Sequence, residues 1–168
     1  MELKIYSDKQ EVASEFSNFF AEKVKESDSF NVALSGGSTP KIVFDVLANE
    51  FGSDLDWNKV HFYWGDERCV PPTDDESNYK MTVEHLLSKI EIPEENIHRI
   101  KGENEPKGEA VRYSEVIEQY LSESNGIPTF DLVILGMGDD GHTASIFPHE
   151  IDLWHSEKTC EVAVHPDS

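Results

Sequence analysis

The residues best suited to chemistry in this 168-residue chain lie in three short, polar, glycine-containing segments. They are residues 35–39 (SGGST), 65–68 (GDER) and 136–142 (GMGDDGH). Glycine lets the backbone approach a ligand closely, whereas hydroxyl, guanidinium and imidazole groups bind anions or transfer protons. Together the segments contain the groups needed for an anion site and for acid/base catalysis.

The first segment has the composition of a phosphate-binding turn. Gly36 and Gly37 would bring backbone N–H groups close to an anion at the start of a helix, and Ser38 and Thr39 add hydroxyl donors. The GxxxxGK[ST] spacing of a nucleotide-binding loop is absent, so a sugar phosphate or another small phosphorylated metabolite fits better than ATP. A turn in which Ser or Thr only caps the helix is equally compatible with these residues.

His142 is the candidate acid/base residue. Imidazole exchanges protons near neutral pH, and the carboxylate of Asp140 could fix its tautomer and raise its basicity. Any one of the seven histidines would by default have an ordinary surface or packing role. His142 differs because it follows the strongest predicted strand, at the edge where the other two segments emerge.

Arg68 is a cation among acidic residues at the end of another predicted strand. It could bind a phosphate or carboxylate in bidentate fashion, or it could form only a surface ion pair with Asp66 or Glu67. Its position favours the first interpretation. The acidic residues 74–76 are interpreted as a solvated loop rather than a metal site, and His61 as a residue within a strand.

Residues 136–141 also match the dinucleotide-binding pattern GxGxxG after a strand. Asp139 and Asp140 would place two carboxylates beside a pyrophosphate. Pro148 leaves only about five residues for a helix that this motif needs at full length, and no acidic residue follows suitably at the end of the next strand. We therefore set the dinucleotide interpretation aside.

Alternating strands and helices must position these segments. Apolar runs predict strands at residues 3–6, 30–34, 60–64, 97–100, 130–135 and 160–164, with helical periodicity beginning near residues 12, 40, 78 and 110. This alternation predicts one α/β domain over residues 1–168, Rossmann-like, with a mainly parallel sheet and helices on both faces. Each polar segment follows a predicted strand, so all three should converge at the carboxyl edge of the sheet, where ligands bind.

The chain is strongly acidic, with 14 Lys+Arg against 34 Asp+Glu and a formal net charge of −20. This balance excludes a nucleic-acid binder that works by bulk charge, and it disfavours docking on an anionic membrane. No apolar stretch approaches the roughly 20 residues of a membrane-spanning helix, and the start lacks the apolar region of a signal peptide, so we expect a cytoplasmic protein. Cys69 and Cys160 have no CxxC or zinc-site spacing and should be free thiols.

In their order and separation, the stretches SGGSTP, WGDERCVPPTDDESNYKM and GMGDDGHTASIFP resemble the 6-phosphogluconolactonase family, over roughly residues 30–168. The resemblance implies hydrolysis of 6-phospho-D-glucono-1,5-lactone to 6-phosphogluconate in the oxidative pentose-phosphate pathway, with no metal or organic cofactor. The implied phosphate site is Gly36, Gly37, Ser38 and Thr39, the implied substrate contacts are Arg68, Asp66 and Asn78, and the implied acid/base pair is His142 with Asp140.

Two other functions stay open on the same fold. Glucosamine-6-phosphate deaminase is the nearer one, but deaminases typically continue after Asp-Gly-His into an Asn-Glu-Pro segment, whereas residues 143–148 read TASIFP. A non-catalytic sugar-phosphate sensor is the other. Family members usually continue beyond the position of Ser168, so we expect the C-terminal part of the family fold, including basic residues that complete the phosphate site, to be absent. The sequence leaves the oligomeric state open.

Overall fold

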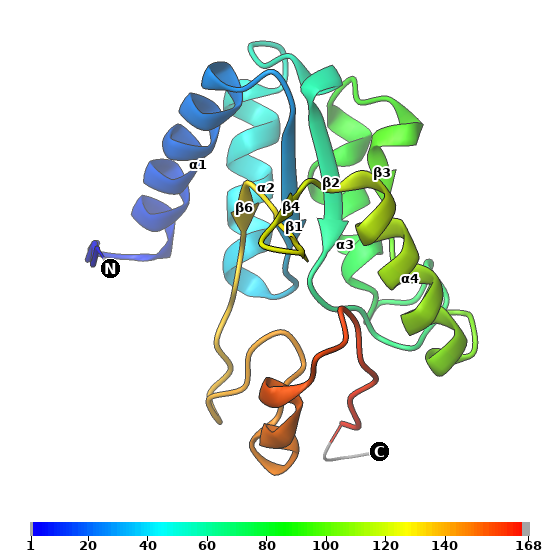
Figure 1. Cartoon of the computed structure of the whole chain (residues 1–168). Helices are drawn as coiled ribbons and strands as arrows, with labels where there is room; N and C mark the ends of the chain where they lie inside the picture. The colour runs from blue at the N-terminus through cyan, green and yellow to red at the C-terminus, as the bar shows by residue number, and fades with distance from the viewer. Residues whose placement is uncertain (1, 166–168) are drawn as a thin grey trace.

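A parallel four-stranded sheet organises residues 2–165, which are the residues that the computed structural model describes (Figure 1). Its strands are β1 (Phe30–Leu34), β2 (Val60–Trp64), β3 (Ile97–His98) and β6 (Leu132–Val133), in the order β3-β2-β1-β6. Every neighbouring pair runs parallel. The predicted α/β class is confirmed.

Within the described residues, four α-helices connect and cover the strands. They are α1 (Lys9–Glu26), α2 (Ser38–Phe51), α3 (Asn78–His85) and α4 (Pro106–Tyr120). The remaining elements are the 3-10 helices η1 (Trp57–Lys59), η2 (Leu87–Lys89), η3 (Glu94–Asn96) and η4 (Pro148–His155), and a hairpin of β4 (Glu123–Ser124) and β5 (Ile127–Pro128). Within residues 2–165, no helix has the length and apolar character needed to cross a membrane. Cys69 and Cys160 are free, as predicted.

Side chains at the helix starts explain where the helices begin. The carboxylate of Asp8 accepts the N–H of Glu11 at 2.9 Å, and the Ser77 hydroxyl accepts the N–H of Lys80 at 3.1 Å. The α2 helix differs, because it begins at Ser38 rather than at Pro40 and its cap residue is Gly37, which has no side chain to contribute. The first N–H groups of α2 therefore have no side-chain cap.

The two central strands are apolar because helices cover both of their faces. Val32 and Phe62 are fully buried in a core that they share with α1, α2 and the end of α3. On the opposite face, Tyr63 packs with Tyr113 and Ile117 of α4. Covered strands read as nearly continuous apolar runs, which is why the sequence predicted them well.

The predictions for the outer segments were less accurate. The predicted strands at residues 3–6 and 160–164 are wrong, since neither segment pairs with a strand among the described residues, and Leu3 and Ile5 lie exposed. The predicted strand 130–135 is reduced to Leu132–Val133, which pair with Val32 and Ala33 of β1. An apolar sequence pattern reflects only local composition. A strand also needs a neighbouring strand with free backbone N–H and C=O groups to pair with.

The strand directions bring the polar segments to one end of the sheet. Residues 35–39 follow β1, residues 65–68 follow β2 and residues 136–142 follow β6. Figure 1 shows the orange and red part of the chain, from about residue 136 onward, at the end of the sheet to which the β2 arrow points. Parallel pairing therefore gathers segments that lie far apart in the sequence.

Candidate functional site

A cleft of about 240 Å³ lies at the carboxyl ends of β1, β2 and β6. Its lining includes the predicted residues Gly36, Gly37, Ser38, Thr39, Asp66, Arg68, Asn78 and His142. Asp140 is not part of the lining, but its carboxylate contacts the His142 ring. The structure thus brings together the residues that the sequence singled out, from three strand ends and the start of α3.

Close packing explains the glycine at position 36. A Cβ atom there would lie 1.8 Å from Oδ1 of Asn78, so any side chain would displace Asn78. Asn78 is itself held in place, because its Nδ2 donates to the carbonyl of Asp66 at 3.0 Å. Gly36 therefore allows the turn after β1 to lie against Asn78 at the start of α3.

Lys9 is not part of the cleft lining but contacts it through Ser38, and sequence reasoning did not consider this residue. Its Nζ donates to the Ser38 hydroxyl at 3.2 Å, so a cation from the first turn of α1 lies beside the start of α2. Nothing in the sequence near Lys9 resembles a binding motif. Only the packing of α1 against α2 places it there.

Glu67 organises the turn that carries Arg68. Its carboxylate accepts the N–H groups of Arg68 at 2.7 Å, Asn78 at 2.8 Å and Tyr79 at 2.9 Å, together with the Ser77 hydroxyl at 3.1 Å. Sequence reasoning considered Glu67 only as an ion-pair partner. No local sequence signal marked this capping role, because Glu67 lies 11 residues before Asn78, the first residue of α3.

Arg68 keeps its charge available. The ion pair with Asp66 or Glu67 that the sequence left open is not formed, and no hydrogen bond or salt bridge engages the guanidinium among residues 2–165. The side chain is half-buried and lines the cleft. It therefore offers N–H donors and a positive charge to an anion.

His142 is oriented by Asp140. The ring Nδ1 lies 2.6 Å from Oδ1 of Asp140, and the same oxygen accepts the backbone N–H of His142 at 3.2 Å. The backbone hydrogen bond and the bond to the ring both lower the pKa of Asp140. The glycine at position 138 leaves room for the His142 ring in this position, since a Cβ atom there would lie 2.3 Å from Cε1 of His142. Nε2 of His142 is the ring atom left for proton transfer.

A strained turn follows His142. The N–H of Ile146 donates to the carbonyl of Thr143 at 2.8 Å, and the two residues between them, Ala144 and Ser145, have φ angles of 47° and 61°. A left-handed conformation costs a non-glycine residue about 1–2 kcal/mol, so tertiary contacts must hold this turn. The hydroxyl of Ser145 donates to Oδ2 of Asp66 at 2.6 Å, a contact that sequence reasoning missed.

As far as residue 165, where the described part of the chain ends, no α-helix follows the glycines of residues 136–141. The chain continues through the turn at residues 143–146 into η4, a 3-10 helix that starts at Pro148. The dinucleotide interpretation needs a full helix at this place, so the structure agrees with setting it aside.

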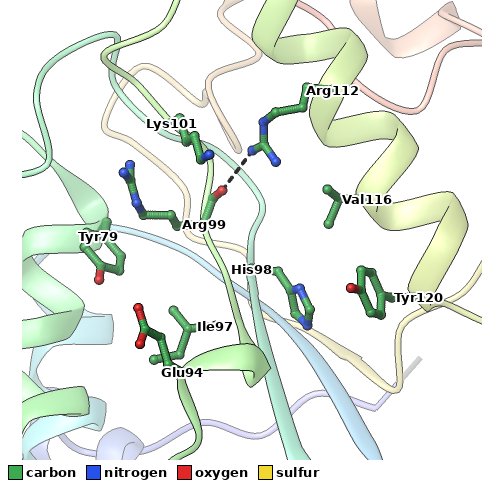
Figure 2. Close-up of a pocket in the computed structure, with 9 residues that line it drawn as sticks. All are labelled: Tyr79, Glu94, Ile97, His98, Arg99, Lys101, Arg112, Val116 and Tyr120. Carbon is green, nitrogen blue, oxygen red and sulfur yellow. Dashed lines mark hydrogen bonds between the residues drawn. The ribbon is translucent and has the colours of Figure 1, made fainter.

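A second cavity, of about 320 Å³, lies beside β3 and α4 (Figure 2). Its lining is Tyr79, Glu94, Ile97, His98, Arg99, Lys101, Arg112, Val116 and Tyr120. Unlike Arg68, its arginines are paired: Arg99 binds both carboxylate oxygens of Glu103, at 2.9 and 2.7 Å, and Nε of Arg112 binds Glu109 at 2.8 Å. Arg112 also donates to the carbonyl of Arg99, the dashed line in Figure 2.

Glu109 is the centre of this second network. Burial opposes its charged form, but hydrogen bonds from Arg112, the backbone of Lys101 and Asn104 outweigh burial and lower its pKa. The side chain is almost fully buried. These contacts tie the segment after β3 to α4 and thus have a structural role.

His98 lies at the other end of the second cavity, within a group of aromatic rings. Its ring stacks on Tyr63 with centroids 4.5 Å apart, and it also contacts His61 and Tyr120. Burial, with a smaller contribution from His61, lowers its pKa to about 4. His98 is therefore neutral at physiological pH and packs as an aromatic residue.

No set of three or more His, Cys, Asp or Glu side chains within residues 2–165 is arranged to hold a metal ion. The acidic residues 74–76 instead cap and pair locally: Asp75 binds Lys80, and the side chain of Asp74 accepts the N–H of Glu76 at 2.9 Å. The interpretation of these residues as a solvated loop agrees with their contacts.

Comparison with known proteins gives consistent matches. Residues 7–168 match the family model described as "Glucosamine-6-phosphate isomerases/6-phosphogluconolactonase". The chain is 46% identical to 6-phosphogluconolactonase of Treponema pallidum over 168 residues, which is the whole of this chain and 70% of that protein. It is 48% identical to 6-phosphogluconolactonase of Haemophilus influenzae over 139 residues, 82% of this chain and 58% of that protein.

A solved structure agrees with the sequence matches. The crystal structure of devB protein superposes with a TM-score of 0.94 at 43% identity, covering 98% of this chain and 69% of that one. The chain thus spans between 58% and 70% of the length of these relatives.

Proposed function

The chain belongs to the glucosamine-6-phosphate isomerase/6-phosphogluconolactonase family, and from this premise we propose that the whole protein hydrolyses 6-phospho-D-glucono-1,5-lactone to 6-phosphogluconate. The relatives at 46% and 48% identity are named 6-phosphogluconolactonases. The observation that carries the proposal is that one cleft contains both an oriented histidine, His142 at 2.6 Å from Asp140, and an arginine, Arg68, that has no ion-pair partner among residues 2–165.

The phosphate of the substrate binds at the start of α2. Gly36 and Gly37 allow close approach to the backbone, the first N–H groups of the helix have no side-chain cap, and the hydroxyls of Ser38 and Thr39 line the cleft. A helix N-terminus favours an anion through its free N–H groups and its dipole. Lys9, in contact with Ser38, adds a positive charge from α1.

Arg68 and Asp66 contact the sugar lactone on the other side of the cleft. Arg68 supplies charge-assisted donors. Asp66 uses Oδ2 to accept the Ser145 hydroxyl, so Oδ1 remains as an acceptor for a substrate hydroxyl. Asn78 holds the Asp66 backbone and so supports this side of the cleft.

His142 acts as the general base and then as the general acid. Nε2 takes a proton from water as the water oxygen attacks the lactone carbonyl carbon. The tetrahedral adduct then collapses, the bond between C1 and the ring oxygen breaks, and Nε2 returns the proton to that oxygen. Asp140, at Nδ1, fixes the tautomer that leaves Nε2 free to accept a proton. Acid/base catalysis of this kind contributes roughly 10²–10⁴ in rate.

A direct test separates this function from its two alternatives. The full-length protein is incubated with 6-phosphogluconolactone, generated freshly, and separately with glucosamine 6-phosphate. We expect lactone hydrolysis well above the spontaneous rate and no release of ammonia. Ammonia release with lactone hydrolysis at background would indicate a deaminase, and binding of 6-phosphogluconate without turnover of either substrate would indicate a sensor.

A further inference from the structure

We propose that Ser145 is a positioning residue for the proposed hydrolysis: its hydroxyl fixes both the carboxylate of Asp66 and the loop that carries His142. The proposal deepens the proposed function and rests on it. Ser145 lies outside the phosphate turn and outside the His142–Asp140 pair. Its contact joins two segments that are 79 residues apart in the sequence.

The contact is a short hydrogen bond from a hydroxyl to a carboxylate oxygen. Oγ of Ser145 lies 2.6 Å from Oδ2 of Asp66, and both side chains are half-buried. Hydrogen bonds between a hydroxyl and a carboxylate are short and strong because one partner carries a full charge. Ser145 therefore selects one orientation of the Asp66 carboxylate and leaves Oδ1 for the substrate.

The backbone of the same turn needs such a contact. Ala144 and Ser145 are both left-handed although neither is glycine, and the turn closes through the Thr143–Ile146 hydrogen bond. Two adjacent residues of this kind persist only where the surroundings over-determine them. On the far side of the turn, the buried ring of Phe147 packs on His142 at 4.9 Å. The loop is thus held at both ends, by Phe147 and by Ser145.

The location of the contact connects it to the reaction. Asp66, His142 and Ser145 all line the same cleft, with Arg68 two residues beyond Asp66. Loss of the Ser145 hydroxyl would release the Asp66 carboxylate and loosen the His142 loop together, while the phosphate turn at the start of α2 would stay intact. Misplacing catalytic groups lowers kcat more than it raises KM when the main binding contacts are unchanged.

The test uses four variants of the full-length protein: Ser145→Ala, Ser145→Gly, Asp66→Ala and the Asp66→Ala/Ser145→Ala double variant. Ser145→Ala removes the hydroxyl and keeps the backbone penalty, whereas Ser145→Gly removes both. We expect kcat to fall roughly tenfold in each single Ser145 variant, with KM changed less than about twofold. Because Ser145 acts through Asp66, its loss should add little once Asp66 is already alanine.

Ser114→Ala is the matched control. It also removes a hydroxyl that is bound at 2.9 Å, to the carbonyl of Ala110, but on α4 and away from the cleft. We expect its kcat and KM to equal those of the unmodified protein. A Ser145→Gly variant with full kcat would overturn the proposal, because it would show that relief of backbone strain is all that position 145 requires.

Amide hydrogen exchange provides a readout that does not depend on turnover. Ser145→Ala should speed exchange across residues 141–147 and leave residues 30–39 unchanged. Unchanged exchange at 141–147 would also overturn the proposal. If the unmodified protein does not hydrolyse the lactone, the proposed function fails, and exchange alone decides whether Ser145 tethers the loop.

Discussion

The two cavities of this molecule differ in what their arginines are free to do. The cavity beside β3 is the larger and is lined by Arg99, Lys101 and Arg112. Among residues 2–165, Arg68 is the only arginine or lysine in the lining of the cleft at the strand ends. Yet both arginines of the larger cavity are paired with carboxylates, at Glu103 and Glu109. Arg68 has no such partner among the described residues.

This difference teaches that available donors, rather than the number of charges, indicate where an anion binds. A paired arginine has already exchanged its hydration for a carboxylate, so an incoming phosphate must displace that carboxylate. In the cleft, an unpaired guanidinium and uncapped helix N–H groups face the same space. Contact donors of this kind outweigh distant surface carboxylates, which are screened beyond about 8 Å at physiological salt. The net charge of −20 is therefore compatible with a small phosphorylated substrate.

The largest expected effect is on kcat, and it distinguishes His142 in the cleft from His98 in the cavity beside β3. His142→Gln should lower kcat for the lactone roughly 10²–10⁴-fold, because Nε2 is the proposed proton carrier. His98→Gln should leave kcat unchanged, since His98 lies in the cavity beside β3. Steady-state kinetics on both variants, with circular dichroism to verify folding, makes the comparison. Full activity in His142→Gln would contradict the assigned role.

The cations give the next largest effect. Arg68→Met should reduce kcat/KM by about 10- to 100-fold, the usual contribution of hydrogen bonds to a charged group. Lys101→Met removes a charge from the lining of the other cavity and should change kcat/KM less than twofold. The two variants are compared at several salt concentrations. Equal losses in both would show that general charge, and not local donors, attracts the substrate.

Substitution of Glu109, beside the cavity at β3, should lower the stability of the protein. Glu109→Gln removes the charge that Arg112, Asn104 and the N–H of Lys101 share, and we expect a loss of about 1.5 kcal/mol in the free energy of unfolding. The folded fraction should retain the kcat of the unmodified protein. Chemical denaturation and kinetics check the two halves of this prediction. A fall in kcat without a loss of stability would assign the network to the active site.

The smallest effect concerns pH. The pKa of His98 is about 4 in the folded protein against an ordinary value of 6.5, so the unfolded chain binds the proton more readily. The contribution of His98 to the free energy of unfolding is therefore fully present above pH 6.5 and is lost as the pH falls toward 4. After allowance for partial exposure, we expect about 1 kcal/mol of this loss between pH 7 and pH 5. His98→Gln should show a correspondingly flatter stability curve over that range, and an identical slope would contradict the buried, neutral state.

Much of the fold followed from local sequence patterns. The apolar runs of β1 and β2 and the periodicity of α1 and α4 predicted those elements, because covered strands and amphipathic helices leave strong periodic signals. The segments at residues 3–6 and 160–164 carried similar apolar content, yet they form no strands. Their content could not reveal whether a pairing partner lies beside them.

The sequence by itself determined which residue types follow each strand, and parallel order then required residues 35–39, 65–68 and 136–142 to meet at one edge. Only the tertiary structure decided the state of each side chain there. It left Arg68 without an ion-pair partner in the described part of the chain, oriented Glu67 to cap α3, and brought Ser145 into contact with Asp66, 79 residues away in the sequence. The physical reason is that strand order depends on local apolar patterns, whereas hydrogen-bond partners depend on distances between segments that the sequence does not encode locally.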